Sequence, residues 1–93
     1  MLLNWSSRFS RDLKRLARRS PEQREKIEKT LNLLEENPFH PSLHTHKLKG
    51  DLSGIWSCSI DYDYRILFEF VIDPESQENS ILLLALGSHD VVY

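Results

Sequence analysis

A chain of 93 residues is long enough for one domain with one modest hydrophobic core, and 40% hydrophobic and 28% charged residues are typical of a globular protein. Its single cysteine excludes an internal disulfide, and no apolar stretch approaches the ~20 residues of a membrane span. The first residues lack the pattern of a signal peptide, so we expect residues 1–93 to form a single domain in the cytoplasm, without contact to a membrane.

The first half of the chain is predicted to be helical after a short strand. The apolar segment LLNW (residues 2–5) suits a strand, and the following residues repeat their apolar positions at helical spacing. The sequence SPEQ then starts a second helix, because Ser20 can cap it, Pro21 suits its first turn and Gln23 can complete a capping box. This helix should end at the NP pair of residues 37–38, because the residue before proline avoids the helical conformation.

The second half reads as strands joined by short turns. Apolar residues alternate in most of these segments, and the links GDLSG, DYD and DPESQEN are rich in turn-forming residues. Together with the first half, this predicts an α+β fold: an N-terminal strand and a two-helix hairpin packed on one face of a small, mainly antiparallel sheet. The predicted strands of the second half are residues 43–49, 55–60, 64–72 and 80–86.

The charges are distributed unevenly along the chain, although the net charge is only −2. Residues 1–30 carry nine Lys and Arg against four Asp and Glu, a balance of +5. Residues 50–93 carry one Arg against eight Asp and Glu, a balance of −7. Most of these charges are expected only to solvate the surface. The net charge alone argues against general binding to nucleic acid, whereas the uneven distribution of charge along the chain is compatible with a local basic site.

The four histidines do not form a metal-binding pattern. His44 and His46 point the same way if they lie on a strand, but no third ligand is evident and the lone Cys58 should face the core. We therefore expect no metal ion and no cofactor. The simplest interpretation of His44 and His46 is a pair of surface histidines on a strand.

Arg65 is the only Arg or Lys after Lys49, and it stands in the middle of an apolar strand. One interpretation is an ordinary ion pair with Glu69 or an aspartate. The other is an anion site, because a guanidinium fixed in a sheet binds phosphate with two-pronged geometry. Lys47 and Lys49 alternate onto one face of the preceding strand and are expected to join it. With a nearby imidazole, such a cluster suits an RNA phosphodiester.

The segment KLKGDLSGIWSCSIDYDYRILFEF, followed by a last strand and GSHDVVY, resembles the RelE/ParE superfamily of small bacterial toxins. The similarity is greatest to the RelE/StbE, YoeB and YafQ-like branches and covers nearly the whole chain. The resemblance implies a type II toxin–antitoxin system and a ribonuclease that cleaves mRNA in the ribosomal A site, which inhibits translation. The implied partners are the ribosome and a cognate antitoxin protein, with DNA bound only through the antitoxin.

The resemblance also assigns roles to individual residues. The strand arginine of the family falls on Arg65, the terminal general-acid histidine on His89 and the closing aromatic on Tyr93. The lysine ahead of the LSG motif is Lys49. The general-base position of the YoeB-like pattern falls on His46, which is a departure, although imidazole is also a competent base.

A second departure concerns the segment of Ser57, Cys58 and Ser59, where members of the family often have basic residues. Fewer cations would weaken phosphate binding, so a catalytically weakened toxin that acts mainly through its antitoxin is one alternative. A ParE-like inhibitor of DNA gyrase is another, and the His-plus-aromatic ending argues against it. If His46 is not the base, Asp51, Asp61 or ribosomal RNA would have to serve.

The implied reaction needs no metal. The ribose 2′-OH attacks the adjacent phosphorus and yields a 2′,3′-cyclic phosphate and a 5′-OH fragment. In this scheme His46 is the base and His89 is the acid, while Arg65 and Lys49, assisted by Lys47, stabilise the phosphoryl oxygens. Tyr93 would stack on a base or orient the substrate. We further expect the antitoxin to lie across the helices or the sheet with acidic groups toward Arg11, Arg15 or Arg18.

Overall fold

The computed structural model describes residues 1–52 and 54–88, and of Asp51 only the backbone. Within these residues, two helices and five strands follow in the predicted order, and the strands form one sheet with the order β1-β5-β4-β3-β2. β1 is parallel to β5, and all other neighbours are antiparallel. The predicted α+β fold is therefore confirmed. The elements are β1 (Leu2–Trp5), α1 (Ser7–Arg19), α2 (Pro21–Glu36), η1 (Pro41–Leu43), β2 (His46–Lys47), η2 (Gly50–Leu52), β3 (Trp56–Ser59), β4 (Tyr64–Ile72) and β5 (Asn79–Ser88).

The two helices are separated by a single residue, Ser20, which ends α1 and caps α2. Its backbone N–H donates to the carbonyl of Leu16, and its hydroxyl accepts from the backbone N–H of Gln23 at 3.2 Å. The expected capping box is only half formed, because the amide nitrogen of the Gln23 side chain reaches Asp61 in the turn between β3 and β4 at 3.5 Å. The hydrogen bond from Gln23 to Asp61 links the start of α2 to the sheet.

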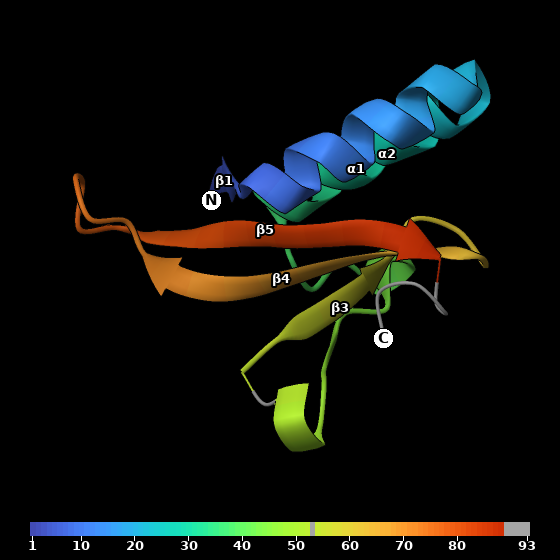
Figure 1. Cartoon of the computed structure of the whole chain (residues 1–93). Helices are drawn as coiled ribbons and strands as arrows, with labels where there is room; N and C mark the ends of the chain where they lie inside the picture. The colour runs from blue at the N-terminus through green and yellow to red at the C-terminus, as the bar shows by residue number, and fades with distance from the viewer. Residues whose placement is uncertain (53, 89–93) are drawn as a thin grey trace.

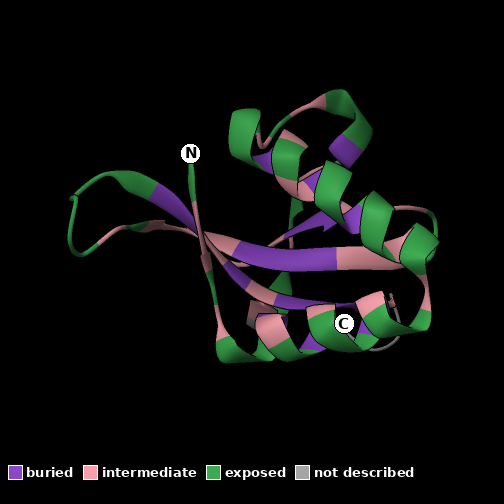
Figure 2. Ribbon diagram, turned by 90° about the horizontal axis from the view of Figure 1, so that it is seen from above, coloured by how far each residue is buried: buried purple, intermediate pink, exposed green. Residues whose placement is uncertain are grey.

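Both helices pack on the same face of the sheet (Figure 1). Their buried stripes meet alternate residues of β3, β4 and β5, and Figure 2 shows these buried segments on the inner sides of the helices and along the strands. The opposite sides of the helices are exposed. The fully buried core on this face consists of Phe9, Ile27, Leu34, Leu43, Cys58, Ile66, Phe68, Ile81, Leu83 and Leu86, with Leu16 nearly so.

The other face, here called the helix-free face, carries the alternate residues of the same strands. Leu67 and Ala85 are buried there, because Leu48 and Ile55 from the segment between β2 and β3 pack over them. Figure 1 shows η2, which belongs to this segment, on the side of the sheet away from the helices.

The predicted strand 43–49 is wrong in its extent, because only His46–Lys47 pairs with β3. Before it, Pro41 opens the short helix η1, and His44 adopts a left-handed backbone conformation with φ of 50°. A left-handed residue cannot continue a strand. The break turns the chain so that His44 and His46 approach the β3–β4 turn.

Helix α1 also secures the free edge of β5 beyond the end of β1. The hydroxyl of Ser6 donates to the carbonyl of Leu84 at 3.1 Å. The residue Asp12 is only 6% exposed, and its carboxylate accepts from the backbone N–H of Leu86 at 3.0 Å. Asp12 thereby satisfies a buried amide on the side of β5 where, among the described strands, β1 no longer pairs; this part of β5 lies beside Arg65.

Candidate active site

A pocket of about 440 Å³ opens where β2, β3 and β4 meet at one end of the sheet. The residues come from η1, the left-handed corner, β2, the β3–β4 turn and β4. Because these segments are held by strand pairing and by α2, the pocket has fixed walls. It is lined by Ser42, His44, His46, Ser59, Ile60, Asp61, Tyr62 and Arg65.

Arg65 provides the positive charge of this pocket. On β4 it pairs in register with Ser59 on one side and Gly87 on the other, and its guanidinium donates to the hydroxyl of Ser59. Among the described residues, neither Glu69 nor any other carboxylate forms an ion pair with Arg65. The alternative of an ordinary ion pair therefore finds no support in this part of the chain. Within residues 1–52 and 54–88 the guanidinium has no other hydrogen-bond partner, so its remaining N–H groups can donate to an oxyanion.

His46 provides a group that can accept a proton. Its Nδ1 lies 2.9 Å from the backbone carbonyl oxygen of His44. A carbonyl oxygen can only accept a hydrogen bond, so Nδ1 carries the proton and the neutral ring presents the lone pair of Nε2. The left-handed turn at His44 creates this contact, and it fixes the tautomer that a general base requires.

The other two described histidines have different roles. Nδ1 of His40 accepts from the backbone N–H of Ser42 at 3.1 Å, so His40 caps η1. His44 lines the pocket beside His46. Among the described residues, no group of three His, Cys, Asp or Glu side chains is placed to hold a metal ion.

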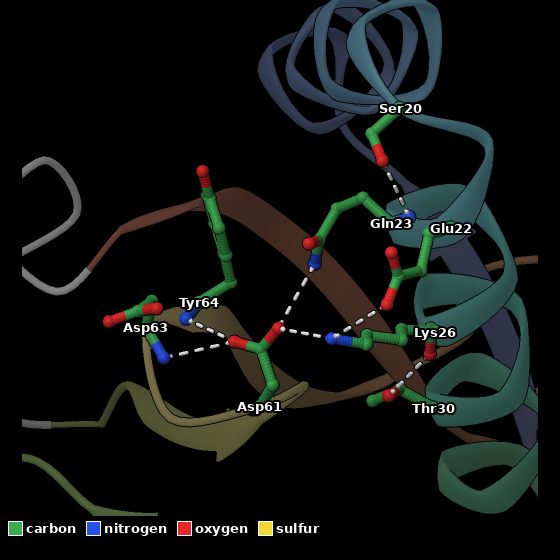
Figure 3. Close-up of polar contacts among 8 residues, drawn as sticks. All are labelled: Ser20, Glu22, Gln23, Lys26, Thr30, Asp61, Asp63 and Tyr64. Atoms are coloured by element: carbon green, nitrogen blue, oxygen red, sulfur yellow. Dashed lines mark hydrogen bonds and ion pairs between the residues drawn. The ribbon is translucent and has the colours of Figure 1, made fainter.

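Asp61 lines the pocket but is fully engaged in holding the β3–β4 turn (Figure 3). Its Oδ1 accepts from the backbone N–H groups of Asp63 and Tyr64, both at 2.9 Å. Its Oδ2 lies 3.4 Å from Nζ of Lys26 and 3.5 Å from the side-chain nitrogen of Gln23, both on α2. Partial burial raises the pKa of Asp61, but these hydrogen bonds together hold it below the usual value. Asp61 is therefore a weak base.

Comparisons with known proteins agree with this fold. A family model described as "Bacterial toxin of type II toxin-antitoxin system, YafQ" matches residues 1–93. The chain belongs to the YafQ family of bacterial toxins. The predicted resemblance is confirmed at the level of this family.

Solved structures resemble the YafQ-family chain over nearly its full length. The YoeB/ParE toxin from Agrobacterium tumefaciens has a TM-score of 0.78 and 24% identity, over 96% of this chain and 99% of the other. YafQ from E. coli has a TM-score of 0.77 and 18% identity, over 98% and 96%. A YoeB–YefM complex from Staphylococcus aureus has a TM-score of 0.72 and 21% identity, over 96% and 98%. At these identities the structures share the fold. A search of curated proteins finds no match.

The structure brings only some of the predicted site residues of this YafQ-family chain together. His46 and Arg65 line one pocket, whereas its described lining does not include Lys47 or Lys49. Lys47 is the register partner of Trp56, which packs on the helix side, so it lies on the face opposite to His46. Lys49 follows β2 and precedes η2. His89 and Tyr93 lie outside the described residues.

The surroundings of the WSCS segment explain why it has serine and cysteine instead of basic residues. Cys58 faces the core as predicted, and burial raises the pKa of its thiol to about 12 although Arg65 lowers it. This thiol is therefore neutral and unreactive. Ser57 is also fully buried, and Ser59 accepts the hydrogen bond of Arg65. Sequence reasoning missed that Ser59 and Tyr62 line the pocket. The aspartates that flank Tyr62 in DYD were the available signal for a tight turn.

Among the described residues, no helix has the length and apolar character needed to cross a membrane.

Proposed function

We propose that this YafQ-family toxin is a ribosome-dependent mRNA endoribonuclease that cleaves in the A site and thereby stops translation. The observation that supports it best is the presence of Arg65 and His46 in one pocket. The pocket combines a guanidinium without a described carboxylate partner and an imidazole with Nε2 open to a proton. These are two of the three groups that transesterification of RNA requires without a metal.

In the proposed reaction, Nε2 of His46 takes the proton of the ribose 2′-OH as its oxygen attacks the neighbouring phosphorus. The bond from phosphorus to the 5′ oxygen breaks, and His89 donates a proton to that oxygen. The products are a 2′,3′-cyclic phosphate and a 5′-OH fragment. Arg65 binds the phosphoryl oxygens, whose negative charge increases in the transition state.

The roles of the other candidate residues follow the family resemblance. The sequence supports His89 as the acid, since it follows Ser88, and Ser88 pairs with Tyr64 next to Arg65. Lys47 and Lys49 would attract the RNA backbone from outside the pocket instead of binding the scissile phosphate. Tyr93 would contact a base. We expect neither a metal ion nor a cofactor to take part.

The proposed partner outside the ribosome is a cognate antitoxin. Relatives of the same fold are described as the E. coli DinJ–YafQ and the S. aureus YoeB–YefM complexes. In this chain a second groove of about 550 Å³ runs between β1, α1 and α2, with apolar side chains that include Leu3, Trp5 and Leu31. Arginines on the exposed side of α1 would attract an acidic, amphipathic antitoxin segment. DNA would be contacted only through the antitoxin.

The decisive experiment is cleavage of mRNA on programmed ribosomes under single-turnover conditions. We expect His46→Ala to reduce the rate by about 10²–10⁴-fold, the range for a general acid or base, with ribosome binding preserved. Arg65→Gln should reduce it at least as much, because it removes charge stabilisation.

Exposed Glu75, in the loop between β4 and β5, offers a control: Glu75→Ala should cleave at the wild-type rate. If His46→Ala cleaves mRNA at the wild-type rate, His46 is only a surface histidine and another group must be the general base. Pulse labelling in cells separates the alternatives. If DNA synthesis fails before protein synthesis, the toxin is a gyrase inhibitor. If neither fails, it is a weakened toxin that acts through its antitoxin.

A further inference from the structure

Tyr62 is the most exposed large side chain among the described apolar and aromatic residues, with 93% of its surface accessible. It nevertheless lines the same pocket as Arg65 and His46. A tyrosine with so little contact contributes almost nothing to the core, and an isolated exposed aromatic needs no explanation by itself. The position of Tyr62 does require an explanation, because it lies at the mouth of a pocket that contains a guanidinium and an imidazole.

The turn that carries Tyr62 is unusually well fixed. The backbone N–H groups of Ile60 and Asp61 point to the carbonyl oxygen of Tyr64, at 3.0 and 3.5 Å. The carboxylate of Asp61 accepts the two N–H groups that follow Tyr62 and also contacts Lys26 of α2 (Figure 3). The backbone on both sides of Tyr62 is therefore held, while its ring projects into solvent. An aromatic ring on a rigid support loses little entropy when it binds a flat partner.

The pocket beside this ring suits one nucleotide unit. Its volume of about 440 Å³ falls within the range of ordinary small-molecule sites of roughly 300–1,000 Å³. Arg65 supplies a binding group for a phosphate, and Tyr62, three residues away on the same turn and strand, supplies a flat apolar surface at the rim. Phosphate-binding cations with adjacent exposed aromatic rings are the usual elements of sites for single-stranded nucleic acid.

We propose that Tyr62 is a base-stacking residue, whose ring packs on the nucleobase next to the scissile phosphate while Arg65 binds that phosphate. This inference rests on the proposed ribonuclease function and deepens it. It adds a base contact within the described pocket that is distinct from the terminal Tyr93. Because every base has a π-face, this contact fixes the position of the nucleotide more than its identity.

The test is single-turnover cleavage on programmed ribosomes, with mRNA that carries either a normal A-site codon or one abasic nucleotide at each codon position in turn. Tyr62→Ala should lower the apparent second-order rate constant by about 5- to 150-fold, the effect of losing one stacked base. Tyr62→Phe should retain the wild-type rate, whereas Tyr62→Leu, of similar bulk but without a π-system, should be impaired.

The abasic series identifies the contact itself. At one codon position, removal of the base should slow the wild type by about the same factor as Tyr62→Ala, and should have no further effect on Tyr62→Ala. Thermal unfolding of all three variants should match the wild type, because Tyr62 is almost completely exposed.

The outcomes separate this inference from the function on which it rests. A wild type that does not cleave mRNA overturns both. Cleavage that is normal in Tyr62→Ala, or equally sensitive to the abasic site in both proteins, overturns the stacking role alone. Normal cleavage by Tyr62→Ala combined with escape from neutralisation by the antitoxin would overturn it in favour of a protein contact.

Discussion

Replacing Asp12 should destabilise the toxin far more than a helical surface aspartate normally does. The carboxylate is nearly buried and accepts the backbone N–H of Leu86, which is itself fully buried. Hydrogen bonds to charged groups contribute about 1.5–3 kcal/mol, and Asp12→Ala would leave this amide unpaired. The ion pairs with Arg8 and Arg15, at 3.6 and 3.0 Å, involve arginines that are half exposed and add only about 0.2–1 kcal/mol each.

The expected cost of Asp12→Ala is therefore about 2–4 kcal/mol in the free energy of unfolding. A domain of this size should lose about 8–32 °C in Tm, since each kcal/mol shifts Tm by roughly 4–8 °C. Asp12→Asn keeps an oxygen acceptor for Leu86 and should lose about half as much. Urea unfolding at neutral pH measures both values, and the denaturant slope should not change.

Glu28→Ala provides the matched control, because it removes an ion pair with Arg24 on the exposed side of α2. It should cost less than about 1 kcal/mol. If Asp12→Ala unfolds within about 0.5 kcal/mol of the wild type, the edge of β5 does not depend on this carboxylate and the reasoning is wrong.

Three further predictions concern Asp61, Cys58 and Trp5. Folding lowers the pKa of the Asp61 carboxyl, so the ionised carboxylate stabilises the folded protein. This stabilisation is complete above the ordinary carboxyl pKa of about 3.9 and is lost as the pH falls through the lower pKa of the folded protein. In urea unfolding at a series of pH values, Asp61→Asn should therefore lose less stability toward acid than the wild type. A thiol reagent should modify buried Cys58 only as fast as the protein unfolds, and modification at mixing speed would contradict its burial. Trp5, half exposed in the second groove, should be an anchor for the antitoxin, so Trp5→Ala should weaken the complex by about 30-fold or more in calorimetry, while an unchanged affinity would move the interface elsewhere.

The local signals in the sequence were sufficient for most of the elements. Ser20 and Pro21 begin α2 as predicted, and the helix ends before the NP pair, because capping and proline geometry depend on adjacent residues alone. The alternation of β4 predicted residues 64–72 correctly. The strand 43–49 was overextended because the left-handed residue His44 left no signal in the apolar pattern.

The site was less predictable, because it depends on pairings between distant strands. His46 and Arg65 were both identified, and the register of β2, β3 and β4 brings them to one face. The same register separates Lys47 from them: alternation already places residues 46 and 47 on opposite faces, but which of the two faces carries Arg65 depends on the strand pairing. The engagement of Asp61 by α2 required knowledge of tertiary contacts, since Gln23 was expected to cap its own helix.

The parallel pairing of β1 with β5 has a consequence for how the toxin is made. β1 precedes the other strands and both helices in the sequence, but its hydrogen-bond partners are residues 80–83, which are synthesised after all of them. β5 also lies between β1 and β4, so β1 cannot join the other strands in one sheet until β5 has been synthesised. Until then the apolar stripes of the helix hairpin have no complete surface to cover them, and folding must wait for a contact of very long sequence separation. The sheet of a nascent toxin therefore assembles only after β5 has been synthesised, and a chain interrupted before β5 lacks the strand that pairs with β4 beside Arg65.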